Sequence, residues 1–346
     1  METLLTIFRD VDDPRDMNAR HDLSSILFIA LAASLCGAKS CVDYADFGAA
    51  NEEELSEIVD LPHGAPSHDC FSRIFRLIDP DELATALTRF TQAIREGLGL
   101  GAPQDVVAID GKSLRRGYER GRAYAPPLMV GVWDAETRIS IAAGLAPNGN
   151  EVAGTLALLK TLTLKGCIVT ADALHCHPAM AEAVKASGAD YALGLKANRS
   201  AFYKAAVEAY EKADAKGFLP IHERVERGHD REEWRCATVI PCPKGLVFPH
   251  LVAIGRIQAE RQRGDKVEHS TRYIALSKNL TPVRLFEVTR AHWSIENDLH
   301  WQLDVAFHED QSRTRKDNAP QNIALIRRIA LDILRAHPEK RSPAAK

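Results

Sequence analysis

The sequence has little that would suit a secreted or membrane-spanning protein. Its seven cysteines are scattered and form no C-x-x-C pair, so neither a zinc ribbon nor a secreted disulfide framework is expected. The apolar run ILFIALAASLCGA is shorter than the roughly 20 residues that a bilayer requires. The segment before it, FRDVDDPRDMNARHD, is polar and contains acids, which does not suit a signal peptide. We therefore expect a protein of the reducing cytoplasm.

An excess of positive charge is also missing. The 346 residues carry a formal net charge of -3, so the total charge does not indicate a nucleic-acid binder. Contacts with nucleic acid depend on local patches, however, and the C-terminal part of the chain is such a patch. From Gln311 onward the only acids are Asp317, Asp332 and Glu339, and the basic residues are Arg313, Arg315, Lys316, Arg327, Arg328, Arg335, Lys340, Arg341 and Lys346.

Several common site motifs are absent. The segment DGKS is not a phosphate-binding loop, because Val106 stands where the first glycine of that motif belongs. No G-x-S-x-G elbow of a serine hydrolase occurs. A helix would place His292 and His300 roughly 12 Å apart along its axis, too far to share one zinc ion. The short cluster LHCHP has no spaced partner pair, so we do not expect it to be a ligand set.

Residues 1–98 are predicted to form a helical N-terminal domain. Asp22 or Ser24 can cap a helix that runs through Leu35, and Gly37 would end it. The segments SCVDYADFGAA, NEEELSEIV, HDCFSRIFRLI and DPDELATALTRFTQAIREGL are also typical of helices. Short helices joined by tight turns allow a DNA-binding helix-turn-helix. A plain helical bundle fits equally well, because this stretch is acidic where a DNA-reading helix should be basic.

After the linker GLGLGAPQD, the pattern predicts an α/β domain with a mixed sheet over residues 104–336. Apolar runs indicate strands at VVAID, PPLMVGVWD, RISIAAGLAP, GCIVTAD and DYALGLK, with helices at EVAGTLALLKTLTL and HPAMAEAVKASG. Residues from about 200 to 280 alternate in polarity and are predicted to be a mainly β-rich insertion. Helices resume at Pro282, and residues 337–346 form a basic tail.

Three acids stand out in this domain. Asp110 and Asp172 each end an apolar strand, and ligands of open α/β sheets bind at the carboxyl ends of strands. An aspartate in this place is often only a turn or cap residue. Two of them, with Glu296 from a later helix, would make a three-acid cluster. Carboxylates suit Mg²⁺, and such a cluster suits two-metal phosphodiester cleavage.

Basic residues flank two of these acids. Such residues are usually only solvated, but clustering beside acids is what phosphate-binding partners would require. Lys112, Arg115, Arg116, Arg120 and Arg122 follow Asp110, and Lys196 and Arg199 follow the strand after Asp172.

The segment HWSIENDLHWQLDVAFHED, which contains the third acid, has helical spacing. Ile295, Leu299 and Leu303 are predicted to face a core. We expect Trp293 and Trp301 to pack in the fold rather than to stack on nucleic-acid bases.

The motifs VVAIDGKSLR, IVTADALHC, DYALGLKANR and HWSIENDLHWQLDVAFHEDQSRTRKDNAPQNIALIRRIAL resemble those of the H-repeat-associated insertion-sequence transposases. The N-terminal segments DPRDMNARHDLSSILFIALAASLCGA and PSHDCFSRIF are similar to that family as well, so the resemblance covers nearly the whole chain. These transposases belong to the DDE class and have a ribonuclease H-like catalytic core. The last motif is long and therefore specific.

The resemblance implies a transposase that cleaves DNA at the ends of a mobile element and joins the freed 3′-hydroxyl to target DNA. Asp110, Asp172 and Glu296 match the catalytic and metal-binding acids. Two Mg²⁺ ions are expected, for which Mn²⁺ would substitute. The partners would be double-stranded DNA and further copies of the chain, in a bacterial cytoplasm. The β-rich stretch matches an insertion before the last catalytic helix.

Further DNA contacts follow from the same resemblance. The segment GHDREEWR is similar to a family motif, in which Arg231, Glu233 and Arg235 would contact DNA or brace the fold. The wider superfamily places Arg four residues before the final Glu and Lys seven after it, where this chain has His292 and Leu303. The residues that could take over their phosphate contacts are His292, His300, Arg313, Arg315 and Lys316.

The leading hypothesis is an active DDE transposase that binds the ends of its element as an oligomer. Two alternatives stay open. One is a catalytically silent DNA-binding protein derived from a transposase, and the other is a Mg²⁺-dependent nuclease without strand transfer. Inverted repeats flanking the gene would favour transposition.

Overall fold

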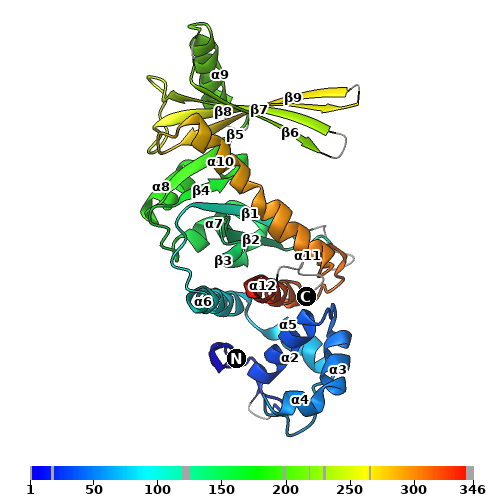
Figure 1. Ribbon diagram of the computed structural model, residues 1–346. Helices are drawn as coiled ribbons and strands as arrows, with labels where there is room; N and C mark the ends of the chain where they lie inside the picture. The colour runs from blue at the N-terminus through cyan, green and yellow to red at the C-terminus, as the bar shows by residue number, and fades with distance from the viewer. Residues whose placement is uncertain are drawn as a thin grey trace. The chain divides into compact units, whose positions relative to one another are not determined.

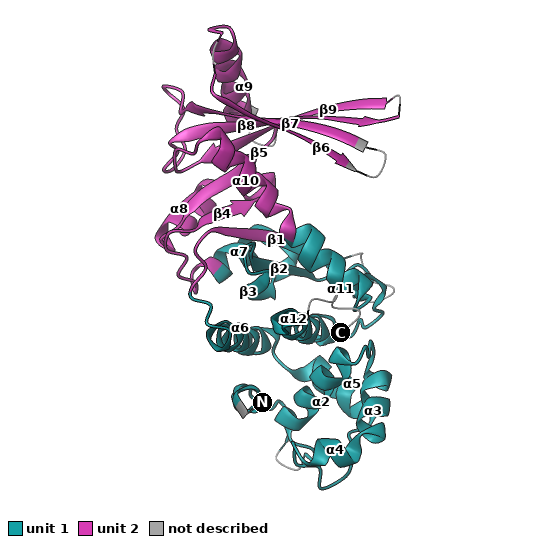
Figure 2. Cartoon of the chain, viewed as in Figure 1, with its two compact units in different colours: residues 1–101, 111–158, 295–346 teal, residues 102–110, 159–294 magenta. Residues whose placement is uncertain are grey.

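The computed structural model describes residues 2–16, 19–118, 125–197, 200–217, 219–228, 231–264 and 266–339. They group into two compact units, coloured separately in Figure 2. Unit 1 combines Met1–Gly101, Gly111–Leu158 and Ile295–Lys346, and unit 2 combines Ala102–Asp110 and Leu159–Ser294. Each unit is therefore built from segments far apart in the sequence. The predicted domain boundary between residues 98 and 104 stays a prediction.

The first part of unit 1 is helical, as predicted. Its helices are α1 (Glu2–Arg9), α2 (Leu23–Leu35), α3 (Cys41–Ala50), α4 (Glu52–Ser56), α5 (His68–Leu77) and α6 (Pro80–Gly97). The helix starts follow capping chemistry, because Asp22 accepts a hydrogen bond from the Ser25 N–H and Ser40 forms a capping box with Asp43. Helix α2 is apolar nearly all round and is buried accordingly.

The remainder of unit 1 includes the C-terminal helix, which contacts the helices of the first part. It contains β2 (Leu128–Asp134), β3 (Ile139–Leu145), α7 (Glu151–Leu159), the π-helix η4 (Ile295–His300), α11 (Trp301–Val305) and α12 (Ala319–Ala336). Helix α12 contacts α2, α5, α6 and β3 (Figure 1). The Asn322 side-chain amide of α12 donates to the Phe75 and Ile78 carbonyls at the end of α5. These bonds satisfy carbonyls that the helix end leaves without a partner.

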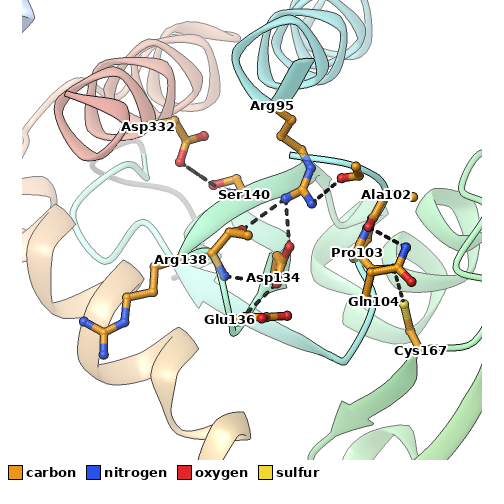
Figure 3. Close-up of polar contacts among 12 residues, drawn as sticks. Arg95, Ala102, Pro103, Gln104, Asp134, Glu136, Arg138, Ser140, Cys167 and Asp332 are labelled. Atoms are coloured by element: carbon orange, nitrogen blue, oxygen red, sulfur yellow. Dashed lines mark hydrogen bonds and ion pairs between the residues drawn. The ribbon is translucent and has the colours of Figure 1, made fainter. Parts of the chain in front are cut away.

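A buried ion pair joins α6 to the first hairpin of unit 1. The Arg95 guanidinium lies 2.8 Å from the Asp134 carboxylate at the end of β2 and also donates to Thr137 and the Gly101 carbonyl (Figure 3). In the same view Ser140 of β3 contacts Asp332 of α12. Because a buried charge is costly without a partner, these contacts fix both helices on the hairpin.

Nine strands of the described residues form one mixed sheet in the order β3-β2-β1-β4-β5-β9-β8-β7-β6. Strands β1 (Val106–Ser113), β4 (Ile168–Ala171) and β5 (Asp190–Leu195) are parallel neighbours, and the other pairings that are resolved are antiparallel. The predicted mixed α/β class, with a helical N-terminal region, is confirmed. Val106 to Ile109 are all buried, as expected for a central strand.

The predicted insertion in unit 2 does not form a separate layer. It contains α9 (Ser200–Asp214) and the long strands β6 (Ile221–Gly228), β7 (Arg231–Pro241), β8 (Ala253–Arg263) and β9 (Lys266–Leu276). Strand β9 pairs with β5, so these strands extend the central sheet. Helix α8 (Pro178–Ala186) connects β4 to β5 along the chain. Helix α10 (Pro282–His292) contacts β4, β6, β7 and β8.

Two details differ from the expectations. Residues 200–214 are helical, whereas the alternating polarity of the stretch as a whole predicts mainly β structure. The predicted final helix is interrupted by a π-helical segment. Its core stripe is confirmed, since Ile295, Leu299 and Leu303 are all buried. None of the described helices is long and apolar enough to cross a membrane.

Candidate active site

Asp172 directly follows β4, as expected, but Asp110 does not end its strand, because β1 runs on to Ser113. The pairing of the two strands still relates the two acids. Val106 to Ala108 of β1 pair with Ile168 to Thr170 of β4, and the same register continued by two residues sets Asp110 opposite Asp172. Asp172 still has an extended backbone, with φ -70° and ψ 180°. Neighbouring strands are about 4.8 Å apart, and residues directly opposite each other point to one face of the sheet. The carboxylates of Asp110 and Asp172 are therefore expected on the same face of the sheet in unit 2.

The carboxylate of Asp172 is held by the short turn that follows it. Its Oδ1 accepts a hydrogen bond from the Leu174 N–H at 2.8 Å and lies 3.2 Å from Nδ1 of His175. His175 is completely buried, whereas the Asp172 side chain is 46% exposed. The hydrogen bond to His175, with that of Leu174 and the positive field of Lys196, lowers the pKa of Asp172. The acid is thus ionised at neutral pH and open to solvent.

His292 of α10 packs over the same face. Its Nδ1 is 3.0 Å from the Thr170 hydroxyl, two residues before Asp172 on β4. Burial lowers the pKa of His292 to about 4, although Asp172 opposes the shift. The neighbouring Trp293 stacks against the Arg272 guanidinium, 4.9 Å from the ring centroid. Trp293 therefore packs in the fold, as expected.

Glu296 lies in unit 1, in the first turn of the π-helix, and is exposed. π-Helical segments are rare and frequently occur at functional sites. His300 ends the same segment. Burial, together with the charges of Arg328 and Lys112, lowers the pKa of His300 to about 3. At neutral pH neither His292 nor His300 carries the charge that would replace a phosphate-binding Arg or Lys.

Trp301 does not follow the packing expectation. Trp301 is 54% exposed at the start of α11, and Val305, one turn later, is 45% exposed. The sequence does not show that Trp301 is exposed, because Trp301 lies between Leu299 and Leu303, which are apolar and buried.

Lys112, which was expected to contact DNA, is buried in unit 1. Its Nζ lies 2.8 Å from both carboxylate oxygens of Asp304 and 3.3 Å from Asp310 Oδ1. Arg115 also reaches Asp310, at 3.2 Å, but its side chain stays 71% exposed. Lys112 thus joins β1 to α11 and to the segment after it, which is a structural role.

The other predicted DNA contacts of unit 1 gather on two adjoining segments. The Arg315 Nε donates to the Arg116 carbonyl at 2.9 Å, which ties the segment after β1 to the segment before α12. Arg315 also lies 5.9 Å from the Tyr118 ring centroid. The exposed basic side chains around this contact belong to Arg115, Arg116, Arg313 and Lys316.

In unit 2 the predicted contacts are more dispersed. Lys196 is exposed directly after β5. Arg235 is largely covered and pairs with Glu233 at 2.6 Å and Glu226 at 3.1 Å, so it braces β7 against β6. Arg199 and the side chain of Arg231 lie outside the described residues, as do Arg120, Arg122 and residues 340–346 of the basic tail.

Sequence reasoning missed the supporting residues of the site. In the sequence His175 is only part of the short cluster LHCHP, which is not expected to be a ligand set, and no pattern there indicates a hydrogen bond to Asp172. Gly194 of β5 lies against the same turn, since a Cβ there would be 3.1 Å from Ala173 N and 3.3 Å from Asp172 C.

The acids of the candidate site provide oxygen ligands, which are the kind that hard divalent cations require. No group of three or more His, Cys, Asp or Glu side chains in the described part of the chain is placed to hold a metal ion. The chemistry of Asp110 and Asp172 nevertheless fits Mg²⁺, which is commonly bound by one or two carboxylates with waters and substrate phosphates.

Comparison with known proteins decides the family. Residues 101–333 match the family described as Transposase DDE domain, and residues 5–91 match its associated N-terminal family, DDE_Tnp_1-associated. The chain belongs to the DDE transposase family. The "H repeat-associated putative transposase YhhI" of Escherichia coli K12 is 30% identical over 91% of this chain and 85% of that protein. The "Putative transposase YncI" of Escherichia coli O157:H7 is 30% identical over 97% of this chain and 88% of that protein.

These findings confirm the resemblance to H-repeat-associated transposases. They also agree with the architecture, in which a helical region precedes a ribonuclease H-like mixed sheet. A further relative, an uncharacterized protein from the dhlA 3′ region of Xanthobacter autotrophicus, is 30% identical over 80% of this chain and 94% of that protein.

Proposed function

We propose that this DDE transposase cleaves DNA at the ends of its element and transfers the strands, using Asp110, Asp172 and Glu296 as the metal-binding acids. The observation that carries the proposal is the parallel register of β1 and β4, which sets Asp110 opposite Asp172 when it is continued by two residues past its last pair, Ala108 and Thr170. Glu296 follows His292 by four residues, so the covalent chain keeps their Cα atoms within about 14 Å. His292 itself is bonded to β4 beside Asp172.

The three acids would hold Mg²⁺, or Mn²⁺ in its place, with two ions expected. When bound, the ions supply the charge that activates the attacking oxygen and stabilises the leaving oxygen of the phosphodiester. The lowered pKa of Asp172 keeps its carboxylate ionised, which is the form that ligates a cation. His292 is neutral and bonded to Thr170, so its contribution is to hold α10 on β4.

The DNA backbone would lie along the exposed basic residues. In unit 1 these are Arg115, Arg116, Arg313 and Lys316, with Arg315 supporting them, and in unit 2 Lys196 follows β5. Charged side chains of this kind position DNA without reading its sequence. The proposed DNA contacts of each unit leave out Lys112, His292, His300 and Arg235, because Lys112 is buried in ion pairs, the two histidines are neutral and Arg235 is paired with glutamates.

The test replaces each acid by its amide. Asp110→Asn, Asp172→Asn and Glu296→Gln should each abolish Mg²⁺-dependent cleavage of DNA that carries the element ends, because an amide is a much weaker ligand for a hard cation. DNA binding measured by gel shift should persist, since the basic residues are unchanged. Cleavage that survives in one variant would remove that residue from the proposed site.

The same assay separates the alternatives. Purified protein is incubated with end sequences, target DNA and Mg²⁺ or Mn²⁺, and both cleaved and joined products are scored. Joined products support strand transfer, cleaved products alone indicate a nuclease, and binding without either indicates a silent DNA-binding descendant. Oligomeric state on DNA and a bacterial cytoplasmic location stay predictions.

A further inference from the structure

The turn after β4 holds the Asp172 carboxylate from one side only. Both hydrogen bonds to this side chain fall on Oδ1, from the Leu174 N–H at 2.8 Å and from His175 Nδ1 at 3.2 Å. No hydrogen bond to Oδ2 is found within the described residues. A carboxylate is acceptor-only, so His175 must carry its proton on Nδ1. The structure therefore distinguishes the two oxygens of one acid.

His175 is fixed in place by its surroundings. The ring is completely buried, and the His175 N–H also donates to the Asp172 carbonyl at 3.2 Å. Acid and histidine are thus joined by a backbone bond and a side-chain bond within one short turn, η2 (Ala173–His175). A buried ring in a three-residue turn has little freedom to rotate, so the direction of the Asp172 side chain is set by the fold.

Gly194 fixes the position of the turn from the β5 side. A Cβ on this residue would lie 3.1 Å from Ala173 N and 3.3 Å from Asp172 C, closer than ordinary van der Waals contact. The backbone of the turn therefore rests closely on β5, and a side chain at residue 194 would have to displace it by a few tenths of an ångström. The contact with β5 holds the backbone of the turn. The hydrogen bond from His175 then fixes the side-chain torsions of Asp172.

We propose that His175 is a positioning residue that directs Oδ2 of Asp172 toward a divalent cation. The inference rests on the proposed function, in which Asp172 is a metal ligand. Residues that hydrogen-bond to a ligating carboxylate commonly change metal affinity by about 10- to 100-fold when they are removed. His175 acts through Asp172 and does not itself touch the cation.

The experiment compares three replacements of His175 in the full-length chain. In His175→Asn the side-chain amide nitrogen occupies the position of Nδ1, whereas in His175→Gln it reaches the position of Nε2. His175→Leu fills a similar volume without a donor. Mn²⁺ binding to the DNA-free protein is measured by electron paramagnetic resonance, and thermal unfolding shows that each variant is folded.

We expect the Leu and Gln variants to bind Mn²⁺ about tenfold or more weakly and the Asn variant to stay within about threefold of the unmodified protein. Equal weakening in all three would show that the ring only fills space, and an unchanged Leu variant would show that the hydrogen bond does not matter. Either result overturns the inference. If one variant fails to fold, the Asn and Gln pair still separates the two nitrogen positions.

Asp172→Asn separates this inference from the proposed function. If Asp172→Asn loses Mn²⁺ binding while His175→Leu keeps it, only the role of His175 is refuted. If Asp172→Asn binds Mn²⁺ as well as the unmodified protein, the metal site itself is refuted, whatever the His175 variants show.

Discussion

Lys112 brings a positive charge into the interior of unit 1. Its side chain is 8% exposed and lies between Asp304 and Asp310, which are 32% and 22% exposed. Removing one partner of such a pair leaves the others as uncompensated charges. Lys112→Met should therefore lower the free energy of unfolding by about 2 kcal/mol, a value reduced for the partial exposure of the two aspartates. Urea denaturation of both proteins measures this change in the free energy of unfolding.

The matched control is Arg115→Met, which removes an exposed charge from the same Asp310. This variant should weaken DNA binding and leave stability within about 0.5 kcal/mol, because exposed ion pairs contribute little. The opposite pattern, with a stable Lys112→Met that binds DNA poorly, would restore Lys112 to the DNA surface.

At this scale the sequence identified some residues and could not identify others. Asp110 and Asp172 were recognisable because each ends an apolar run, and the parallel register sets them opposite each other. The burial of Lys112 depends on Asp304, which is 192 positions away, and no local pattern encodes such a contact. The same holds for Gly194, whose need to lack a side chain arises only when β5 packs against the turn.

Among the elements, α12 contains a buried acid whose ionisation is unfavourable. Asp332 accepts hydrogen bonds from Ser140 N at 3.1 Å and Ser140 Oγ at 3.2 Å. Burial raises its pKa from 3.8 to about 6, against the opposing effects of these bonds and of Arg335. Between about pH 4 and pH 6 the folded state therefore holds a proton on Asp332 that the unfolded state has lost. The contribution of Asp332 to the free energy of unfolding falls as pH rises through this range.

Asp332→Asn cannot ionise and should remove that dependence. The difference in unfolding free energy between Asp332→Asn and the unmodified protein should grow in favour of Asn from pH 4 to pH 6, by on the order of 2 to 3 kcal/mol, and then level off. Chemical denaturation at pH 4, 5, 6 and 7 measures this difference. A difference that does not vary with pH would contradict the shifted pKa.

The elements themselves were predictable where local chemistry decides them. The cap of α2 and the buried run of β1 are examples, and both have the expected positions. The π-helix was not predictable, because Ile295, Leu299 and Leu303 repeat every four residues, a spacing that either kind of helix can bury. Helix α9 was missed because the strong alternation of the strands that follow it dominated the whole stretch.

For the whole molecule, the net charge of -3 and the local basic residues predict opposite behaviour toward DNA. If Arg115, Arg116, Arg313, Lys316 and Lys196 each contact one phosphate, log K should fall against log salt with a slope of about -4 to -5. Gel shifts at salt concentrations from about 50 to about 200 mM measure this slope. Changing Arg313 and Lys316 to Ala should reduce the magnitude of the slope by about 2. Binding that does not change with salt would exclude these residues as phosphate contacts.

The discontinuous make-up of unit 1 has a consequence for the order in which the chain can fold during synthesis. Domains generally fold as their residues leave the ribosome, N-terminal part first. Here the helical N-terminal region is completed by α12, since Asn322 bonds to Phe75 across 247 positions and Arg327 bonds to Lys39 across 288. The first helices must therefore wait for most of the chain to be translated. A nascent chain cut short before α12 would keep the apolar face of α2 uncovered, so premature termination should yield a product for chaperones and proteases instead of a free DNA-binding fragment.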